Sequence, residues 1–399
     1  MQLKILTEQE YNKIIKHKDV SFQQLSNIKK IREIENWEVL YLGMTDKNNK
    51  VVAHGIFGKR KVRFGYYFDC QYGPILDYTN SELVSTFFKQ VKLYFKKQNA
   101  LFFRFNPAIL RNLRNNKGEI ITSYELEESN LLQNSFIKKI KTKSYGNWDM
   151  HTLFVKNLAN LTVETLKTSY SSQAKRSIKK AQKYPLKVSE IDVNNPQNLN
   201  EFVEIMELSA NKKNFTTLKH NYYQNMKEQF GDKFKLYAVT LNFEDLKIEY
   251  QKQITTLTAS LQLQKTEKKI QKIENEIKKL KEALKEIQAE KSTKILSVGC
   301  FIFLNNQIIY LLGGNNATYQ KYASSFFLQN YMMETAINEG KEIYNFYGVH
   351  PNFTKEHPEY GVLRFKQGFN GEIWEYLGTY EISFGIKYTI YKFLKKIVN

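Results

Sequence analysis

The sequence is short of the residues that build disulfide frameworks and metal centres. Its 399 residues include two cysteines, Cys70 and Cys300, with six histidines and six prolines. Both cysteines lie in apolar, strand-like stretches, so we expect buried free thiols in a reducing compartment. The histidines are scattered and match no zinc-binding spacing. The sequence therefore predicts no metal site, and the cytoplasm is the expected compartment.

Several catalytic and targeting signatures are also absent. The sequence contains no HExxH, paired CxxC, GxSxG or GxxxxGK[ST], which argues against zinc proteases, zinc ribbons, α/β-hydrolases and P-loop enzymes. No stretch reaches the apolar length of a membrane span, and the N-terminus lacks the apolar core of a signal peptide. We expect a protein that is free in the cytoplasm or peripheral at the inner face of the cytoplasmic membrane.

Acidic residues are fewer than basic ones, whereas hydrophobic residues are numerous enough to form a core. Sixty Lys and Arg face forty Asp and Glu, which gives a net charge of +20. This charge predicts attraction to nucleic acid, anionic lipid or an anionic substrate, but it does not choose among them. With 42% hydrophobic residues, the chain can bury a core large enough for two domains.

Residues 243–292 contain neither proline nor glycine and separate two strand-like runs, Phe234–Leu241 and Ile295–Leu304. Apolar residues recur every three or four positions at Ile270, Ile273, Ile277, Leu280, Leu284 and Ile287, and a looser version precedes them. A polar join near 264–266 lets the chain reverse. We predict an antiparallel coiled-coil arm whose outer lysines, among them Lys268, Lys269 and Lys272, are a handle for a polyanion. The alternative is that these charges only keep the arm soluble.

The rest of the chain favours an α+β fold with one unit repeated. Strands fill 37–77, a helix spans 81–98 and a strand follows at 100–105, and a similar cycle begins near 161. We predict two tandem acetyltransferase-like (GNAT-like) domains. The first covers 1–157 and is completed by 378–399, the second covers 158–377, and the arm 243–292 is inserted in the second.

The C-terminal stretch 384–398 has apolar residues near helical spacing, with four lysines among them. A basic amphipathic end of this kind could rest on an anionic membrane. The alternative is a final helix that packs on its own domain.

Coenzyme A is not expected as a cofactor. An N-acetyltransferase needs a pyrophosphate loop of the form Arg/Gln-x-x-Gly-x-Gly/Ala at the start of a helix. The nearest stretch, residues 320–325, reads QKYASS and lacks both glycines. The sequence thus predicts no metal and no organic cofactor.

Five segments in order along the chain carry a family resemblance. They are YGPILD (72–77), KRSIKKA (175–181), YLLGG (310–314), YNFYGV (344–349) and LRFKQGF (363–369). Together they resemble the Fem family of aminoacyl-tRNA-dependent enzymes that form peptidoglycan bridges. Many members of that family carry a coiled-coil arm in the second of two acetyltransferase-like domains, which is the arrangement that periodicity predicts here.

The resemblance implies a reaction and a catalytic group. An amine of the peptidoglycan stem peptide, usually of lysine, attacks the aminoacyl ester of a charged tRNA, and the enzyme stabilises the resulting oxyanion. The family's Phe-Lys pair matches Phe365 and Lys366, which makes Lys366 the first candidate for that role, and Tyr310 matches an active-site tyrosine. The alternatives are a surface lysine beside a buried phenylalanine and a core tyrosine.

The acceptor site departs from the family pattern at two positions. The aspartate that some members are proposed to use as base aligns with Asn106, whose amide cannot take a proton. The arginine that grips the precursor phosphate falls at Leu218, beside Lys219. Lys219, Tyr222, and Lys29 with Lys30 remain candidates for substrate binding, although solvated lysines are the commoner explanation.

The resemblance also implies the partners. Aminoacyl-tRNA serves as co-substrate, held by the arm and by Lys175, Arg176, Lys179 and Lys180 of the basic helix. The acceptor is a peptidoglycan precursor, lipid II or UDP-MurNAc-pentapeptide, and glycine, alanine and serine are all open as the transferred residue. The rival interpretations are a coenzyme A-dependent N-acyltransferase and a non-catalytic RNA-binding or immunity protein of the same fold. The sequence leaves the oligomeric state open.

Overall fold

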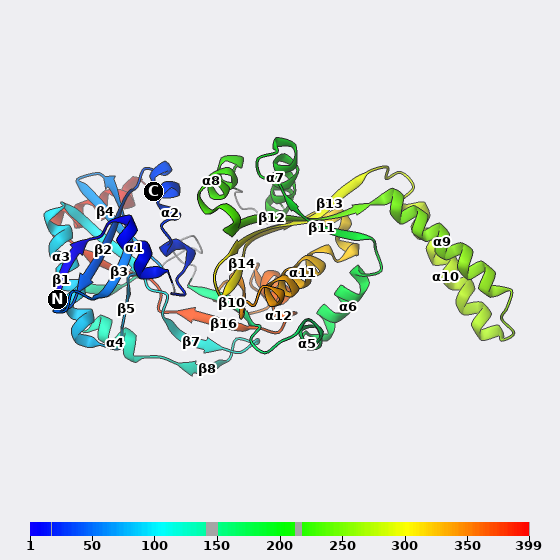
Figure 1. Ribbon diagram of the computed structural model, residues 1–399, viewed down its shortest axis with the longest axis horizontal. Coiled ribbons are helices and arrows are strands. Elements are labelled where there is room, and N and C mark those ends of the chain that lie inside the picture. The colour runs from blue at the N-terminus through cyan, green and yellow to red at the C-terminus, as the bar shows by residue number, and fades with distance from the viewer. Residues whose placement is uncertain (17, 141–150, 212–217, 399) are drawn as a thin grey trace.

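The computed structural model describes residues 1–399 except 17, 141–150, 212–217 and 399. Two β-sheets with their covering helices lie side by side, and a helical arm projects from the second (Figure 1). None of the described helices combines the length and the hydrophobicity needed to span a bilayer.

The first sheet is built mainly from the N-terminal part of the chain. Its order is β1 (Gln2–Ile5), β2 (Glu38–Thr45), β3 (Val51–Val62), β4 (Gly65–Gln71), β6 (Ala100–Asn106), β17 (Tyr380–Ser383) and β9 (Ile137–Lys139), with β5 (Ile75–Leu76) paired to β3. Only β4 and β6 run parallel, joined through α3 (Ser81–Lys97). Asn80 caps α3 by accepting from the Leu83 N–H, and the helix buries a face of phenylalanines against the sheet.

Within the described residues, the second sheet has nine strands. Its order is β11 (Leu186–Ile191), β12 (Phe234–Asn242), β13 (Thr293–Phe303), β14 (Gln307–Asn315), β15 (Ile343–Gly348), β10 (Thr152–Asn157), β16 (Glu372–Tyr376), β7 (Leu110–Arg114) and β8 (Ile120–Ser123). As in the first sheet, three antiparallel strands lead through a helix, α11 (Ser324–Asn338), to a parallel strand. The predicted α+β fold of two acetyltransferase-like units is thereby confirmed.

The remaining helices cover both sheets and join the two halves. One face of the second sheet carries α5 (Val163–Thr168), α6 (Ser172–Ala181), η3 (Ala317–Tyr322), α11 and α12 (Tyr360–Gln367). The other face packs against α7 (Pro196–Asn211) and α8 (His220–Phe230), followed by η2 (Gly231–Lys233), and against α1 (Glu8–Ile15), η1 (Phe22–Gln24) and α2 (Ile28–Ile34). The first half also holds α4 (Leu126–Leu132) and α13 (Gly385–Val398). Because one apolar cluster contains residues of both halves, the halves are held together by a shared core.

The sheets divide the chain differently from the predicted boundary at 157. Strands β7, β8 and β10 lie before that boundary but pair in the second sheet. Polar contacts fix β7 there, because Asn112 and Arg114 both donate to the Glu375 carboxylate of β16. Near the other end of the chain, β17 pairs with β6 and β9 of the first sheet.

The arm consists of α9 (Phe243–Leu261) and α10 (Glu267–Glu286), which leave β12 and return into β13. In α10 the apolar seam positions are partly buried, whereas most positions between them are exposed. The root is anchored to the body: Lys247 Nζ donates to the Glu290 carbonyl at 2.6 Å, and the Tyr319 hydroxyl donates to the Glu290 carboxylate at 2.8 Å.

Candidate active site

The parallel strands β14 and β15 part before they end. Their pairing runs only from Gln307 with Ile343 to Ile309 with Asn345, while β14 continues to Asn315 and β15 to Gly348. In the first sheet, the corresponding strands β4 and β6 stay paired to Gln71 and Asn106. The second sheet therefore offers a place where strand ends separate and backbone groups can face a substrate.

Lys366 lies at this separation. Its side chain is buried, with 5% exposure, and its Nζ donates to the carbonyls of Phe346 at 2.7 Å and Gly348 at 2.6 Å. These carbonyls flank Tyr347, whose φ of +62° is in the left-handed region. The ammonium thus fixes the bend that ends β15. The surface-lysine alternative does not describe this residue, but its catalytic role stays a prediction.

Phe365 and Tyr310 lie on the sheet face that α11 and α12 cover. Phe365 packs against Phe326 and Phe369, with ring centroids 4.9 Å and 5.5 Å apart. Tyr310 joins the same cluster, and a Cβ at Gly313 would overlap its hydroxyl. Glycine at 313 therefore makes the room that the Tyr310 phenol occupies.

Asn106 and Tyr222 lie on the opposite side, between the two halves. The Asn106 Oδ1 accepts from the Tyr72 N–H at 3.1 Å, and Tyr72 makes a side-chain hydrogen bond with Tyr347. Tyr222 lies close to Tyr347 in the same region, and Tyr376 packs edge-on against Tyr72. The structure thus brings Asn106 and Tyr222 together through two tyrosines that sequence reasoning did not single out as site residues.

A sequence signal for those tyrosines did exist. Each is followed by glycine, Tyr72-Gly73 and Tyr347-Gly348, inside segments that carry the family resemblance. Both adopt left-handed backbone, with φ of +51° and +62°. Such values are uncommon for a bulky residue and cluster at functional sites.

The tyrosines of the site are hydrogen-bond donors rather than bases. Burial raises the pKa of Tyr222, Tyr347, Tyr376 and Tyr310 above the ordinary phenol value. They stay protonated at neutral pH. Since Asn106 cannot accept a proton either, none of these side chains can deprotonate an incoming amine.

The predicted phosphate-binding lysines fall on two helices that touch, α2 and α8. Lys29 pairs with Glu8 at 3.4 Å and lies over the Tyr41 ring, whereas Lys30 is exposed. Lys219 is exposed at the N-cap of α8, three residues before Tyr222. Leu218 is partly buried against the shared core, and residues 214–217 of that segment lie outside the described part of the chain.

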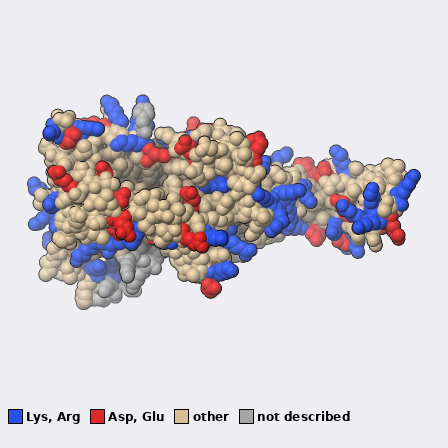
Figure 2. Space-filling model, turned by 90° about the horizontal axis from the view of Figure 1, so that it is seen from below, with Lys and Arg blue, Asp and Glu red and all other residues tan. Residues whose placement is uncertain are grey.

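The basic helix α6 adjoins the helix that carries Lys366. The Ser171 N–H donates to the Gly368 carbonyl at 3.0 Å, and Ala174 packs beside Gly368. The predicted tRNA-binding residues of α6 are all exposed, and none forms an ion pair within the described residues; they are Lys175, Arg176, Lys179 and Lys180. Figure 2 shows Lys and Arg side chains gathered where the arm leaves the body.

The other predicted tRNA contacts lie far from this helix. Lys268, Lys269 and Lys272 stand at the start of α10, beside the turn at the distal end of the arm. The 19 residues of α9 place that turn roughly 30 Å from the root. Residues 243–292 contain eleven lysines against nine Asp and Glu, so the arm carries little of the net charge. The structure does not bring the two predicted groups together.

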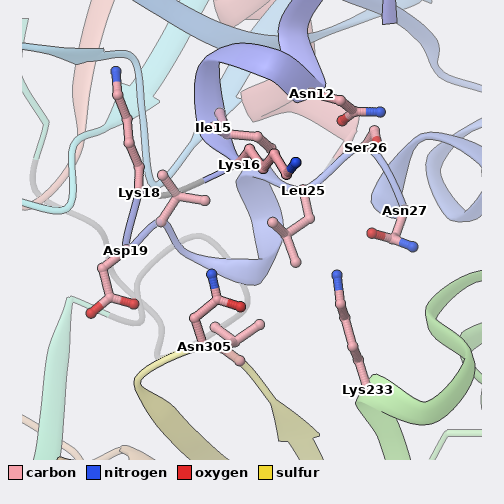
Figure 3. Close-up of a pocket in the computed structure, with 12 residues that line it drawn as sticks. Asn12, Ile15, Lys16, Lys18, Asp19, Leu25, Ser26, Asn27, Lys233 and Asn305 are labelled. Carbon is pink, nitrogen blue, oxygen red and sulfur yellow. The ribbon is translucent and has the colours of Figure 1, made fainter. Parts of the chain in front are cut away.

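A polar cavity of about 290 Å³ lies between the halves, outside the predicted site (Figure 3). Asn12 and Asn27 line it from the first half, and Lys233 and Asn305 from the second. Lys18 also lines it, but its Nζ lies 3.1 Å from the His54 Nε2. Burial and this ammonium lower the pKa of His54 to about 4, so the imidazole is neutral. His54 is thus a packed strand residue rather than an acid or base.

Among the described residues, no three His, Cys, Asp or Glu gather as a metal ion would require. The candidate site is therefore a meeting point of backbone carbonyls, a buried ammonium and protonated phenols. Such groups suit the stabilisation of charge that develops on a substrate.

Comparison with known proteins gives a consistent answer. Residues 6–396 match the FemAB family. The chain is 26% identical to the aminoacyltransferase FemA of Staphylococcus epidermidis, over 94% of each chain. It is also 26% identical to FemA of Staphylococcus aureus, over 90% of this chain and 89% of the relative. The crystal structure of FemX superposes with a TM-score of 0.78 at 17% identity, covering 99% of this chain and all of that one.

The whole-length family match, the FemA relatives and the shared fold agree with the resemblance predicted from five short segments. The chain belongs to the FemAB family and is an aminoacyltransferase.

Proposed function

We propose that the enzyme transfers an amino acid from aminoacyl-tRNA to an amine of a peptidoglycan precursor, at the point where β14 and β15 part. The observation that carries this proposal is the buried Lys366 ammonium at that point, between two differently built faces of the second sheet. Two large anionic substrates can reach one reaction centre without competing for space if each approaches from its own face.

The donor face is the one covered by α6, α11 and α12. The exposed cations of α6 can bind phosphates of the tRNA acceptor stem, since phosphate contacts from Lys and Arg dominate the affinity of proteins for nucleic acid. Ser171, just before that helix, contacts Gly368, and Gly368 follows Lys366 by two residues in the sequence. The helix therefore begins close to Lys366. The ester end of a tRNA held by α6 would then lie near Tyr310 and Phe365.

The acceptor face lies between the two halves. Tyr222, Tyr72 and Tyr347 present protonated hydroxyls, and Lys30 and Lys219 are exposed cations on the adjoining helices α2 and α8. A muropeptide with a pyrophosphate fits this combination of donors and charge. Asn106 acts here by holding the Tyr72 backbone.

The chemistry is the aminolysis of an ester. The amine nitrogen attacks the ester carbonyl, the C–N bond forms, and the bond to the tRNA ribose oxygen breaks. The tetrahedral oxyanion is stabilised by the Lys366 charge and by neighbouring donors. Because the phenols and Asn106 cannot serve as bases, the amine loses its proton to water and the ribose oxygen takes one as it leaves. No metal or organic cofactor takes part in this scheme.

The decisive experiment measures transfer of labelled glycine, alanine and serine from charged tRNA to two acceptors in parallel, lipid II and UDP-MurNAc-pentapeptide. We expect label on one acceptor, and the carrier that is labelled names the substrate. A lipid-linked acceptor would place the enzyme at the inner face of the membrane. If neither acceptor is labelled while a control enzyme labels one, the proposal is wrong and a binding role takes its place.

The tRNA site can be tested separately by charge reversal. K175E/R176E/K179E should weaken tRNA binding at least about ten-fold, because each substitution removes a phosphate contact. The salt dependence of binding should fall as well. The matched variant K268E/K269E/K272E at the arm tip should change the dissociation constant by less than about three-fold, because those residues lie far from the reaction centre. Filter binding at two salt concentrations measures both. An equal loss in the two variants would assign the donor site to the arm as well.

A further inference from the structure

The C-terminal helix α13 has two apolar stripes, and the sheet uses only one. Tyr388 and Tyr391 pack on Phe102 of β6, with ring centroids 5.5 Å and 5.7 Å from that of Phe102. A second stripe at spacing i, i+4, i+7 faces solvent: Ile386 is 76%, Ile390 46% and Phe393 63% exposed. Packing on its own domain therefore explains one face of the helix and leaves the other without a partner in the described chain.

The turn between β3 and β4 adds to this second stripe. Phe64 in that turn is 42% exposed. The next residue, Gly65, lies against the Leu101 side chain, and the Leu101 carbonyl accepts from the Phe384 N–H at 2.9 Å, one residue before α13 begins. The turn and the start of the helix are thus neighbours. We call the exposed surface that they form the α13 face, consisting of Phe64, Ile386, Ile390 and Phe393.

Cations lie in the same two segments as the α13 face. They are Lys61 and Arg63 in the turn and Lys387, Lys392 and Lys395 on the helix, and all are exposed. None forms an ion pair among the described residues. Arg63 and Lys392 lie over the rings of Phe64 and Tyr388, so their stems follow the aromatic surface while the charges stay in water.

We propose that the α13 face binds the surface of an anionic lipid bilayer. The apolar stripe would enter the boundary between headgroups and acyl chains, and the cations of the two segments would contact anionic headgroups, each contributing favourably near such a surface. The helix lies on the bilayer rather than across it, because its 14 residues span roughly 21 Å, short of the hydrocarbon core.

Charge selects the bilayer over a second copy of this chain. Two copies joined through their α13 faces would bring the cations of both copies near one another, and like charges across an interface are strongly unfavourable. An anionic bilayer offers the opposite sign and the apolar interior at once. This inference does not depend on the proposed transfer reaction, because it rests on the α13 face alone.

The test is sedimentation of the full chain with vesicles of phosphatidylcholine alone or mixed with phosphatidylglycerol, without tRNA or precursor. We expect the chain to bind the mixed vesicles, to release in high salt and to ignore phosphatidylcholine. I386S/I390S/F393S should weaken binding at least about ten-fold, since each side chain loses its burial. K387E/K392E/K395E should weaken it similarly on the mixed vesicles.

A matched control has equally exposed apolar residues elsewhere. Leu93 is 61%, Ile248 64% and Leu263 80% exposed, and L93S/I248S/L263S should bind vesicles as the unaltered chain does. Circular dichroism checks that all variants fold, and F64S provides a milder change should the triple variant unfold. The proposal is overturned if the unaltered chain does not bind the mixed vesicles, or if I386S/I390S/F393S and L93S/I248S/L263S bind them alike. It is also overturned if light scattering shows a dimer that I386S/I390S/F393S disperses.

Discussion

Each of the two sheets has a parallel strand pair at the same place in its order of elements, but the two pairs end differently. In the first sheet, β4 and β6 form six residue pairs that run to Gln71 and Asn106. In the second sheet, β14 and β15 form three and then separate. One unit is thus closed at the point where the other is open.

Local contacts explain the difference. At the closed end, the Asn106 side chain accepts a hydrogen bond from the Tyr72 N–H, which extends the contact between the two strands by one residue. At the open end, Lys366 holds the carbonyls on both sides of Tyr347 and bends β15 away. Glycines 313 and 314 let the Tyr310 phenol and helix α7 approach β14 closely. Under the proposed function, catalysis belongs to the open pair and substrate support to the closed pair.

The largest effect should follow from removing the group that keeps the second pair open. K366M should lower kcat by about 10²- to 10³-fold, as loss of a charge-stabilising group does elsewhere. Lys156 is a matched control: it is equally buried at 5% exposure and donates to the Ser169 hydroxyl and the Asn370 carbonyl, away from the strand ends. K156M should lower the melting temperature but leave kcat within about three-fold. Equal losses of kcat would mean that K366M acts through stability.

A second change should narrow the open site from the β14 side. In G313A the new methyl group overlaps the Tyr310 hydroxyl, and we expect about ten-fold lower kcat/KM with about 1–3 kcal/mol of destabilisation. In G313A/Y310F the hydroxyl is removed, which should restore part of the lost kcat/KM and part of the lost stability. G361A on α12, where nothing lies within 4 Å of a new Cβ, should leave kcat/KM unchanged and cause no loss of stability. Additive effects in the double variant would show that the clash is not the cause.

Loosening the closed pair should have a smaller and different effect. N106A leaves the buried Tyr72 N–H without its acceptor, which costs about 1–2 kcal/mol in unfolding free energy. We expect a rise of several-fold in KM for the acceptor with little change in kcat. N106D can still accept from that N–H and should keep stability closer to that of the unaltered chain. If N106A lowers kcat as far as K366M does, the division of roles between the two pairs is wrong.

The smallest effect on catalysis is expected for the control residue Lys156, whose titration should appear only as a pH dependence of stability. Burial lowers the pKa of Lys156 from 10.5 to about 8. Between these values the unfolded chain holds a proton that the folded chain lacks, so stability rises with pH through this window. The unfolding free energy of the unaltered chain relative to K156M should therefore grow by about 1–3 kcal/mol from pH 8 to 10.5. A flat difference in chemical denaturation would mean that Lys156 titrates normally.

Periodicity and strand patterning were enough to predict the architecture. The arm helices, α3 and β6 begin and end close to the predicted residues, because each has a continuous local signal. The predicted boundary at 157 does not follow the sheets, because β7, β8 and β10 pair in the second one. Strand pairing depends on distant partners such as Glu375 that no local pattern identifies.

The site was predicted less completely than the fold. Short family-like segments led to Lys366, Phe365, Tyr310, Asn106 and Tyr222, all of which lie around the open and closed strand ends. The role of Tyr72 and Tyr347 depends on a hydrogen bond across 275 positions of sequence and on left-handed backbone, which only the folded chain shows. That the arm and the basic helix bind one tRNA stays a prediction, since the structure shows only that the arm-tip lysines lie roughly 30 Å from the root.

The placement of β17 has a consequence for synthesis on the ribosome. Strand β9 pairs only with β17 within the described chain, and β17 follows every described strand of the second sheet in the sequence. Domains usually fold as they emerge, the N-terminal one first. Here the N-terminal sheet lacks β17, and with it β9, until the strands of the second sheet have been translated, so the half that is translated first is completed last.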